Sequence, residues 1–427
     1  MMSEDCLVYS TVLMYLLTEQ KLKFMNKFNA IGLIIIIFSI SCTNQKQESI
    51  NESVDLVIQT DVDNKLKMSD YVSGIKYLPL GNNENNVIGK IDKVVFYGNK
   101  IFILDSKTNK IVVYDNTGKY IFETENTGRG PGEYLNIADF IIDSANSNIE
   151  LWDNGNRKLI VLDSNGRFLS ERPIDLRMKK FGKLDSNLYV YFTCNYPNVG
   201  YAKKGSYNIY IEDSSNNVLK CFLPISELTH LKLADNNLFS KSESGFNVAV
   251  PFDNHIYQIT SEECIQRFNI RFNNFSLPDE LLEVYAESIK GTREEISNAS
   301  IMLMNKINNN NYALGIHNIF ENRSILFFQY QITGIGTFTT IFNKRTNDLD
   351  AGIPVNDIDY GLFGKPIAID GNNLVTYIYP YDLIKRKELL EKSNSFDSRN
   401  PEYQRLRHFA DSIRPSDNPI IIRYSLK

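Results

Sequence analysis

The chain has 427 residues, of which 43% are hydrophobic and 23% are charged, a composition typical of a globular protein with a substantial core. Its 51 acidic residues outnumber its 46 basic residues, which gives a formal net charge of −5. The charges are spread along the chain without blocks, so the sequence lacks the basic stripe that nucleic-acid binding requires. We therefore expect no nucleic-acid partner.

An apolar run near the N-terminus is typical of an export signal. Residues Ala30–Ile40 are almost entirely apolar, and Ser41 and Cys42 follow them directly. The run has the length of a signal-peptide core and is too short to span a bilayer, which disfavours an uncleaved membrane anchor. The arrangement resembles a bacterial lipoprotein signal, which implies that residues 1–42 are a signal region and that Cys42 is lipidated. We therefore expect the membrane to be a partner through this lipid anchor.

The residues on either side of this signal indicate the domain organisation. Met25 begins a short positive segment, whereas Met1–Phe24 includes the acidic residues Glu4 and Asp5, so we expect translation to start at Met25. Residues 43–70 are rich in Asn, Gln, Ser, Asp and Lys, which predicts a flexible tether. Residues 71–427 are expected to form the folded domain.

Two stretches of this domain repeat each other 48 residues apart. Residues 101–122 and 149–170 each contain short runs of β-branched and aromatic residues separated by polar turns, which predicts consecutive strands. The offset pairs Asp105 with Asp153, Asp115 with Asp163 and Gly118 with Gly166. Asp and Gly at these positions favour tight turns, because Asp bonds the turn backbone and Gly tolerates positive φ. A period of this size is typical of one blade of a β-propeller.

The strand rhythm continues to the C-terminus and predicts an all-β, six-bladed propeller. Further strands are expected at 187–192, 207–211 and 218–223 for a third blade, at 246–251, 255–259 and 265–272 for a fourth, at 324–330 and 337–342 for a fifth, and at 373–379 for a sixth. A closed ring leaves no long free edge, so strands from both ends of the chain are expected to share the last sheet. Ile75–Leu80 and Pro419–Leu426 are the expected partners.

Two helical insertions are expected to interrupt the ring, at 278–308 and 380–417. In the first, Thr292 and Glu295 have the spacing of a capping box. Such helices either pad loops at the rim or cover one face and shape an opening.

Four segments of the chain are similar to the six-bladed β-propeller lipoproteins of Gram-negative bacteria, with NHL- or TolB-like blades. They are Gly128-Arg-Gly-Pro-Gly-Glu-Tyr134, Ile75–Leu80, Pro251–Tyr257 and Asn418–Lys427. The resemblance covers roughly residues 70–427, and it implies the six-fold ring and a location in the outer part of the cell envelope. It implies no particular activity.

Within the first of these segments, Arg129, Glu133 and Tyr134 are the candidate ligand-binding residues. The glycines and Pro131 are explained first by an unusual backbone path between two blades. The segment does not match a phosphate-binding loop, because no helix opens after it and no Lys-Ser or Lys-Thr pair follows. Binding is the second explanation, in which the three side chains point toward the axial opening.

The sequence favours a binding module over an enzyme. No Gly-x-Ser-x-Gly motif occurs, and none of the histidines has the helical pair spacing of a metal site; they are His230, His255, His317 and His408. We expect no metal and no cofactor. A propeller can nevertheless assemble acidic, His or Tyr side chains from several blades, so the alternative is a metal-dependent lyase or hydrolase with an axial active site.

The expected function is therefore a lipid-anchored binding or interaction module of the cell envelope. The expected location is the outer membrane, facing the periplasm or the cell surface, and the ligand is a glycan, a peptide or another protein. Three widely spaced cysteines are expected to be small buried residues, and their pairing stays open at this point; they are Cys194, Cys221 and Cys264.

Overall fold

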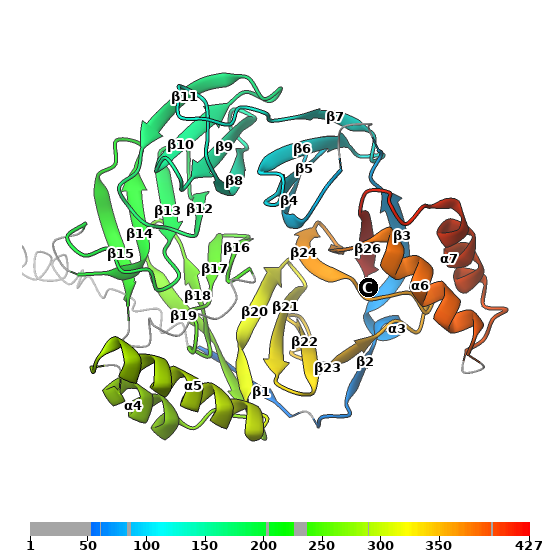
Figure 1. The fold of residues 1–427 in the computed structure, drawn as a ribbon. Helices are drawn as coiled ribbons and strands as arrows, with labels where there is room; N and C mark the ends of the chain where they lie inside the picture. Colours follow the sequence, from blue (N-terminus) through cyan, green and yellow to red (C-terminus); the bar gives the residue numbers. More distant parts are fainter. Residues whose placement is uncertain are drawn as a thin grey trace, which may run out of the picture. The chain divides into compact units, whose positions relative to one another are not determined.

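Six sheets, each built around four antiparallel strands, are arranged in a ring around a central axis (Figure 1). The structure is a computed structural model that describes residues 53–427 except 60, 83–86, 202–204, 226–236, 289 and 394–395. The described residues belong to one unit, Ser53–Lys427. The expected signal region, the start at Met25 and the lipidation site Cys42 lie outside the described residues.

Each of the first three blades is a four-stranded sheet formed by consecutive strands. Blade 1 consists of β4 (Ile91–Tyr97), β5 (Lys100–Asp105), β6 (Lys110–Asp115) and β7 (Tyr120–Glu123). Blade 2 consists of β8 (Ile137–Asp143), β9 (Asn148–Asp153), β10 (Lys158–Leu162) and β11 (Phe168–Pro173). Blade 3 consists of β12 (Lys180–Lys183), β13 (Leu188–Phe192), β14 (Tyr207–Asp213) and β15 (Val218–Pro224).

The other three blades include strands from the N-terminal part of the domain. Blade 4 consists of β16 (Phe239–Ser242), β17 (Gly245–Val248), β18 (His255–Ile259), β19 (Cys264–Phe272) and β1 (Val54–Ile58). Blade 5 consists of β20 (Ala313–Glu321), β21 (Ile325–Ile332), β22 (Gly336–Asn343), β23 (Leu349–Val355) and β2 (Lys65–Lys67). Blade 6 consists of β24 (Lys365–Asp370), β25 (Asn373–Ile378), β26 (Ile420–Leu426) and β3 (Val72–Pro79). The predicted six-bladed β-propeller is confirmed.

The ring closes where the two ends of the domain pair in blade 6. β3 lies antiparallel to β26, with Ile420 opposite Pro79 and Tyr424 opposite Ile75. β26 also pairs with β25 on its other side, so the C-terminal strand is internal to the sheet. The predicted pairing of Ile75–Leu80 with the C-terminal strand is confirmed, and it removes a free edge that two separate ends would leave.

The 48-residue repeat marks equivalent positions in blades 1 and 2. The buried carboxylate of Asp105 accepts hydrogen bonds from four backbone N–H groups, at Gly89, Lys90, Lys107 and Thr108. Asp153 also accepts four, from Leu135, Asn136, Gly155 and Asn156. Each aspartate therefore joins the start of the innermost strand of its blade to the turn between the second and third strands.

The second pair of repeated aspartates forms the outer turns of the same blades. Asp115 Oδ1 accepts from the backbone N–H groups of Thr117 and Lys119, at 2.8 and 3.0 Å. Asp163 makes the same two bonds, to Asn165 and Arg167. The glycines of these turns, Gly118 and Gly166, have φ values of +84° and +82°, as the turn chemistry predicts.

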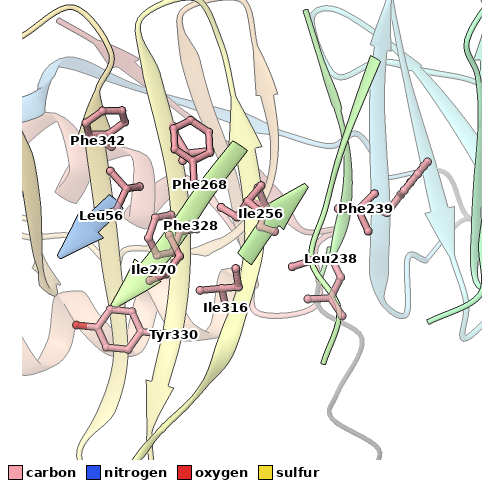
Figure 2. Packing of buried hydrophobic residues seen from close by; sticks show 14 of the residues in the cluster. Leu56, Leu238, Phe239, Ile256, Phe268, Ile270, Ile316, Phe328, Tyr330 and Phe342 are labelled. Atoms are coloured by element: carbon pink, nitrogen blue, oxygen red, sulfur yellow. The ribbon is translucent and has the colours of Figure 1, made fainter. Parts of the chain in front are cut away.

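The segment predicted as a tether is partly folded, which corrects that boundary. β1 runs parallel to β19 on the outside of blade 4, and β2 runs parallel to β23 on the outside of blade 5. The segment is polar overall, but alternate side chains of β1 are buried, and Leu56 lies in the core cluster between blades 4 and 5 (Figure 2). The folded domain therefore begins near Val54 instead of residue 71.

Five helices occur in the described residues, and the larger four form two pairs. α4 (Asp279–Ser288) and α5 (Arg293–Asn309) connect blades 4 and 5, and the predicted capping box of Thr292 and Glu295 is present. α6 (Pro380–Glu391) and α7 (Pro401–Ser412) connect β25 to β26, and α7 buries Tyr403 and Leu406 against blade 6. The short α3 (Met68–Tyr71) precedes β3. Both predicted insertions are confirmed as helical.

Candidate functional site

A cationic cavity of about 760 Å³ opens on the face of the ring at which the innermost strands begin, called here the entrance face. Among the described residues, six cationic side chains line it, together with a single carboxylate, that of Asp92. The cationic residues are Lys90, Arg157, Arg177, Lys179, Lys180 and Lys365. This concentration of positive charge stands out in a chain whose formal net charge is −5.

The propeller topology explains why these residues meet. Lys90 directly precedes β4, Lys180 and Lys365 are the first residues of β12 and β24, and Arg157 directly precedes β10. The starts of innermost strands and the turns between second and third strands lie on the same face of every blade. Residues that are more than 270 positions apart in the sequence therefore line one cavity.

Several of the cationic side chains contact acidic, aromatic or backbone groups of the protein. Lys90 forms an ion pair with Asp92, and Lys179 lies over the Tyr196 ring, 5.9 Å from its centroid. Lys180 Nζ is 3.6 Å from Asp139 Oδ1, while the Arg157 guanidinium donates to the backbone carbonyl of Asp175. Among the described lining residues, the cationic side chains still outnumber the carboxylates.

A buried ion pair lies beside the cavity lining. Asp139 on β8 is fully buried; its Oδ1 is 2.8 Å from Lys93 Nζ on β4, and its Oδ2 accepts from the backbone N–H of Phe181 on β12. Burial lowers the pKa of Lys93, and Asp139 opposes this shift. The pair joins the innermost strands of blades 1, 2 and 3 and fixes Lys180 at the start of β12.

A second cavity, of about 650 Å³, opens on the entrance face between blades 4, 5 and 6. Its polar lining is mostly uncharged, with Asn318, Gln329, Gln331, Thr337 and His317, and apolar residues such as Phe363 complete the wall. Thr337 Oγ1 donates to Gln331 Oε1 at 2.7 Å, and Asn318 Nδ2 donates to Gln329 Oε1 at 2.8 Å. We call it the amide cavity.

The imidazole of His317 is kept neutral in this cavity. Burial lowers its pKa, and the positive charge of Lys365 lowers it further, against a backbone hydrogen bond at Gly315. A neutral imidazole presents one donor and one acceptor. The amide cavity therefore offers donors and acceptors side by side, and no carboxylate is among the residues that line it.

The two cavities adjoin at blades 4 and 6. Lys365 lines both of them, and the neighbouring residues Asn237 and Leu238 line the cationic and the amide cavity respectively. Asn237 Nδ2 donates to Asn318 Oδ1 at 3.1 Å, which connects the two linings directly. Leu238 and Ile316, which both line the amide cavity, lie close together in Figure 2.

The structure does not bring the three predicted ligand-binding residues together around either cavity. Tyr134 is only 1% exposed, and its hydroxyl donates to Thr124 Oγ1 at 2.9 Å within the core between blades 1 and 2. Glu133 Oε2 accepts from the backbone N–H of Gly130 at 2.7 Å and so closes its own loop. Arg129 is exposed. The backbone path between two blades accounts for Glu133 and Tyr134, whereas the role of Arg129 stays a prediction.

The enzymatic alternative has no assembled metal site in the part of the chain that the structure describes. Among those residues, no three His, Cys, Asp or Glu side chains gather closely enough to hold a metal ion. His255 Nδ1 contacts Asp253, whose other oxygen accepts from the Tyr257 hydroxyl, and neither His255 nor Asp253 lines the two cavities. His230 lies outside the described residues.

The helical insertions do not cover the entrance cavities. None of the lining residues of the cationic or the amide cavity belongs to α4, α5, α6 or α7.

Within the described range of residues, no disulfide joins Cys194, Cys221 and Cys264, and burial raises the pKa of the Cys264 thiol to about 12. No helix in that range is both long and apolar enough to cross a membrane.

The sequence of this propeller matches a known protein family. The chain belongs to the family described as domain of unknown function DUF4934, which it matches over residues 51–425. The family match begins just before β1, in agreement with the corrected start of the folded domain. A comparison with functionally curated proteins finds no match.

Two solved structures show the same architecture. A protein from Bacteroides fragilis, whose description proposes that it is exported, is 16% identical with a TM-score of 0.69, over 88% of this chain and 99% of its own. A member of the DUF4221 family from Bacteroides vulgatus is 12% identical with a TM-score of 0.50, over 83% of this chain and 97% of its own. At these identities the likeness concerns the fold.

Sequence reasoning missed the cavity residues because they come from separate blades. The one local signal was the pair Lys179-Lys180 at the start of a short strand that was not predicted. Every blade contributes to one cavity or the other, so only the closed ring brings the charges together.

Proposed function

We propose that the chain is a cell-envelope binding module that holds an anionic ligand in the cationic cavity at the entrance of the propeller axis. One observation carries the proposal: six cationic side chains and a single carboxylate line a cavity of about 760 Å³. This volume is within the range of about 300–1,000 Å³ that is typical of ligand sites.

The electrostatics of the cavity favour ligand recognition over a purely structural role. In the cavity, Arg177 and Lys365 are exposed residues at the opening. A concave site of one sign also concentrates the potential and attracts ligands of the opposite sign.

The proposed location rests on the N-terminal sequence. Residues 30–42 resemble a lipoprotein signal, so we propose a lipid anchor at Cys42 that holds the propeller at the outer membrane. The related Bacteroides fragilis structure, described as a proposed exported protein, supports export in general terms. The intact mass of the mature protein tests the anchor; a mass without lipid on Cys42 would contradict it.

Calorimetric titration of the full-length protein in detergent tests the anionic site. The probes are three small polyanions of different chemistry: tripolyphosphate, tri-glutamate peptide and trigalacturonate. We expect at least one to bind, and we expect the double variant Arg177→Gln/Lys365→Gln to weaken that binding by about tenfold or more, since charged hydrogen bonds contribute about 1.5–3 kcal/mol each. Added salt should weaken binding further.

A charge-matched variant separates the local effect from the change in net charge. Lys76→Gln/Lys119→Gln removes the same two positive charges from exposed positions outside both cavities. We expect this variant to bind like the parent protein. Equal weakening in both double variants, or no binding of any of the three polyanions, would refute the cationic cavity as the binding site.

A further inference from the structure

The amide cavity has a chemistry that complements the cationic cavity next to it. Its side chains carry amide, hydroxyl and imidazole groups, which present donors and acceptors together. Hydroxyl groups of a ligand also act as donor and acceptor at once, so a ligand rich in hydroxyls matches this lining. A second anionic group does not fit as well, because Lys365, at the boundary, is the one Lys or Arg among its lining residues.

The hydrogen bonds within the cavity hold these groups in place. Gln329 accepts from Asn318 and donates to Thr339 Oγ1 at 2.9 Å, so its amide is fixed on both sides. Gln331 Oε1 accepts from Thr337 Oγ1, and this hydrogen bond fixes the orientation of the Gln331 amide group. The donors of the cavity are therefore oriented before a ligand arrives, which lowers the entropic cost of binding.

The walls of the amide cavity suit the apolar faces of a ring. Phe363, Pro354, Pro366 and Leu238 line it beside the polar groups. A saccharide ring has hydroxyl groups around its edge and C–H groups on its faces, so it can use both kinds of wall. A small inorganic anion would leave the polar and apolar walls unused.

The geometry points to a single bipartite site, and we propose that its ligand is an acidic oligosaccharide. A neutral, hydroxyl-rich part of the sugar lies in the amide cavity, and the anionic groups lie among the lysines and arginines of the cationic cavity. Lys365 and the Asn237–Asn318 hydrogen bond mark the junction between the two parts. This inference rests on the proposed anionic site and adds the ligand class to it.

An acidic oligosaccharide differs from the other anionic ligands because it combines charged groups with many hydroxyl groups. An acidic peptide carries charges and amides but few hydroxyl groups, and a polyphosphate carries charge alone. Carboxylate and sulfate are both suitable charged groups on the sugar, so the probes include trigalacturonate and a sulfated trisaccharide of the same length. A neutral trigalactoside of the same length completes the set.

The test compares one variant in each cavity with matched controls, again on the full-length protein in detergent. Gln331→Met keeps the length of the side chain and removes its hydrogen bonds, and Gln266→Met makes the same change at an exposed position on β19. We expect Gln331→Met to weaken at least one acidic trisaccharide by about tenfold, since one or two hydrogen bonds are lost. We expect it to leave tripolyphosphate binding unchanged, and Gln266→Met to change neither.

The outcomes separate this inference from the proposal on which it rests. If Arg177→Gln/Lys365→Gln weakens binding but Gln331→Met does not, the anionic site stands and the bipartite saccharide site is wrong. The saccharide assignment is also wrong if the tri-glutamate peptide binds as tightly as the acidic trisaccharides. If no acidic trisaccharide binds, the inference fails whatever the other anions do. Thermal unfolding of Gln331→Met confirms that the variant is folded.

Discussion

The repeated aspartates of blades 1 and 2 differ from the polar residues of the entrance cavities in what they contact. The repeated aspartates, Asp105 and Asp153, each accept four hydrogen bonds from backbone N–H groups and are fully buried. The cavity residues Lys90, Arg177 and Lys365 come from blades 1, 3 and 6, and they do not occupy repeated positions.

This difference separates residues that specify the ring from residues that are available for a ligand. A carboxylate whose oxygens are already used by the backbone has little capacity left for a ligand. Non-repeating positions at or directly before the starts of the innermost strands instead carry cationic side chains that line the cavity, namely Lys90, Lys180 and Lys365. The residues that made the repeat recognisable are therefore those least suited to binding.

The largest expected effect comes from breaking the ring at its closure. Deletion of Pro419–Lys427 removes β26, which lies between β25 and β3, so blade 6 loses two of its three strand pairings. We expect the cooperative thermal transition to disappear in scanning calorimetry, and ligand binding to disappear with it. A truncated protein with an unchanged transition would show that the ring does not depend on this strand.

The second largest loss of stability is expected from replacing the repeated buried aspartates. Asp153→Ala leaves four backbone N–H groups without their acceptor in a buried position. We expect a loss of about 3–5 kcal/mol in the free energy of unfolding, measured by denaturant titration, and a similar loss for Asp105→Ala. Asp163→Ala, in the exposed outer turn, is the control and should cost clearly less. Equal losses at Asp153 and Asp163 would contradict the assigned role.

A buried carboxylate outside the repeat makes stability depend on pH. Glu212 on β14 is fully buried, and its Oε2 lacks a hydrogen-bond partner among the described residues. Burial raises the pKa of this carboxyl group to about 7, although Tyr201, which donates to Oε1 at 2.6 Å, opposes the shift. The Glu212 carboxyl group therefore binds its proton more tightly in the folded protein than in the unfolded chain, in which its pKa is near 4.5. Stability should fall as the pH rises from about 4.5 to 7, by about 3 kcal/mol in total.

Two variants check this pH dependence by denaturant titration at several pH values. Glu212→Gln should remove the dependence and be more stable than the parent protein at pH 8, with little difference at pH 4. Tyr201→Phe removes a hydrogen bond that favours the charged carboxylate, so the fall in stability should extend to higher pH and become larger in total. A pH profile of the Gln variant that matches the parent profile would assign the dependence to another group.

The smallest effect is expected at Arg129, the exposed residue of the predicted ligand-binding segment. It does not line either entrance cavity. We expect Arg129→Gln to change the free energy of unfolding by less than about 0.5 kcal/mol and to leave trigalacturonate binding unchanged, as measured by calorimetry. A tenfold loss of affinity would instead place the ligand at the Gly128–Tyr134 loop and reverse the comparison of the two regions.

Much of the fold follows from local sequence patterns, but the innermost strands do not. The strands predicted for blades 1 to 3 correspond to β5–β7, β9–β11 and β13–β15, where apolar residues and turn signals alternate clearly. The innermost strands face the axis and carry polar residues such as Lys93, Asp139 and Lys180, so none of the six was predicted. β1 and β2 were missed because their pairing is parallel and more than 200 residues distant in the sequence.

The candidate site was beyond local sequence reasoning for the same physical reason. The glycine-rich segment was predicted as a binding site because its backbone is unusual. In the structure, hydrogen bonds from Gly130 to Glu133 and from Tyr134 to Thr124 give Glu133 and Tyr134 a role in the fold. The cationic residues are ordinary lysines and arginines in the sequence. They form a site only because the ring places the starts of separate innermost strands on one face.

The most direct measurement is a crystal structure of the protein with a bound acidic trisaccharide. We predict density for the sugar across both entrance cavities, with its anionic groups within hydrogen-bond distance of Arg177, Lys180 or Lys365 and a neutral part beside Gln331. Density for the sugar at another surface, with both entrance cavities holding only water, would contradict the account.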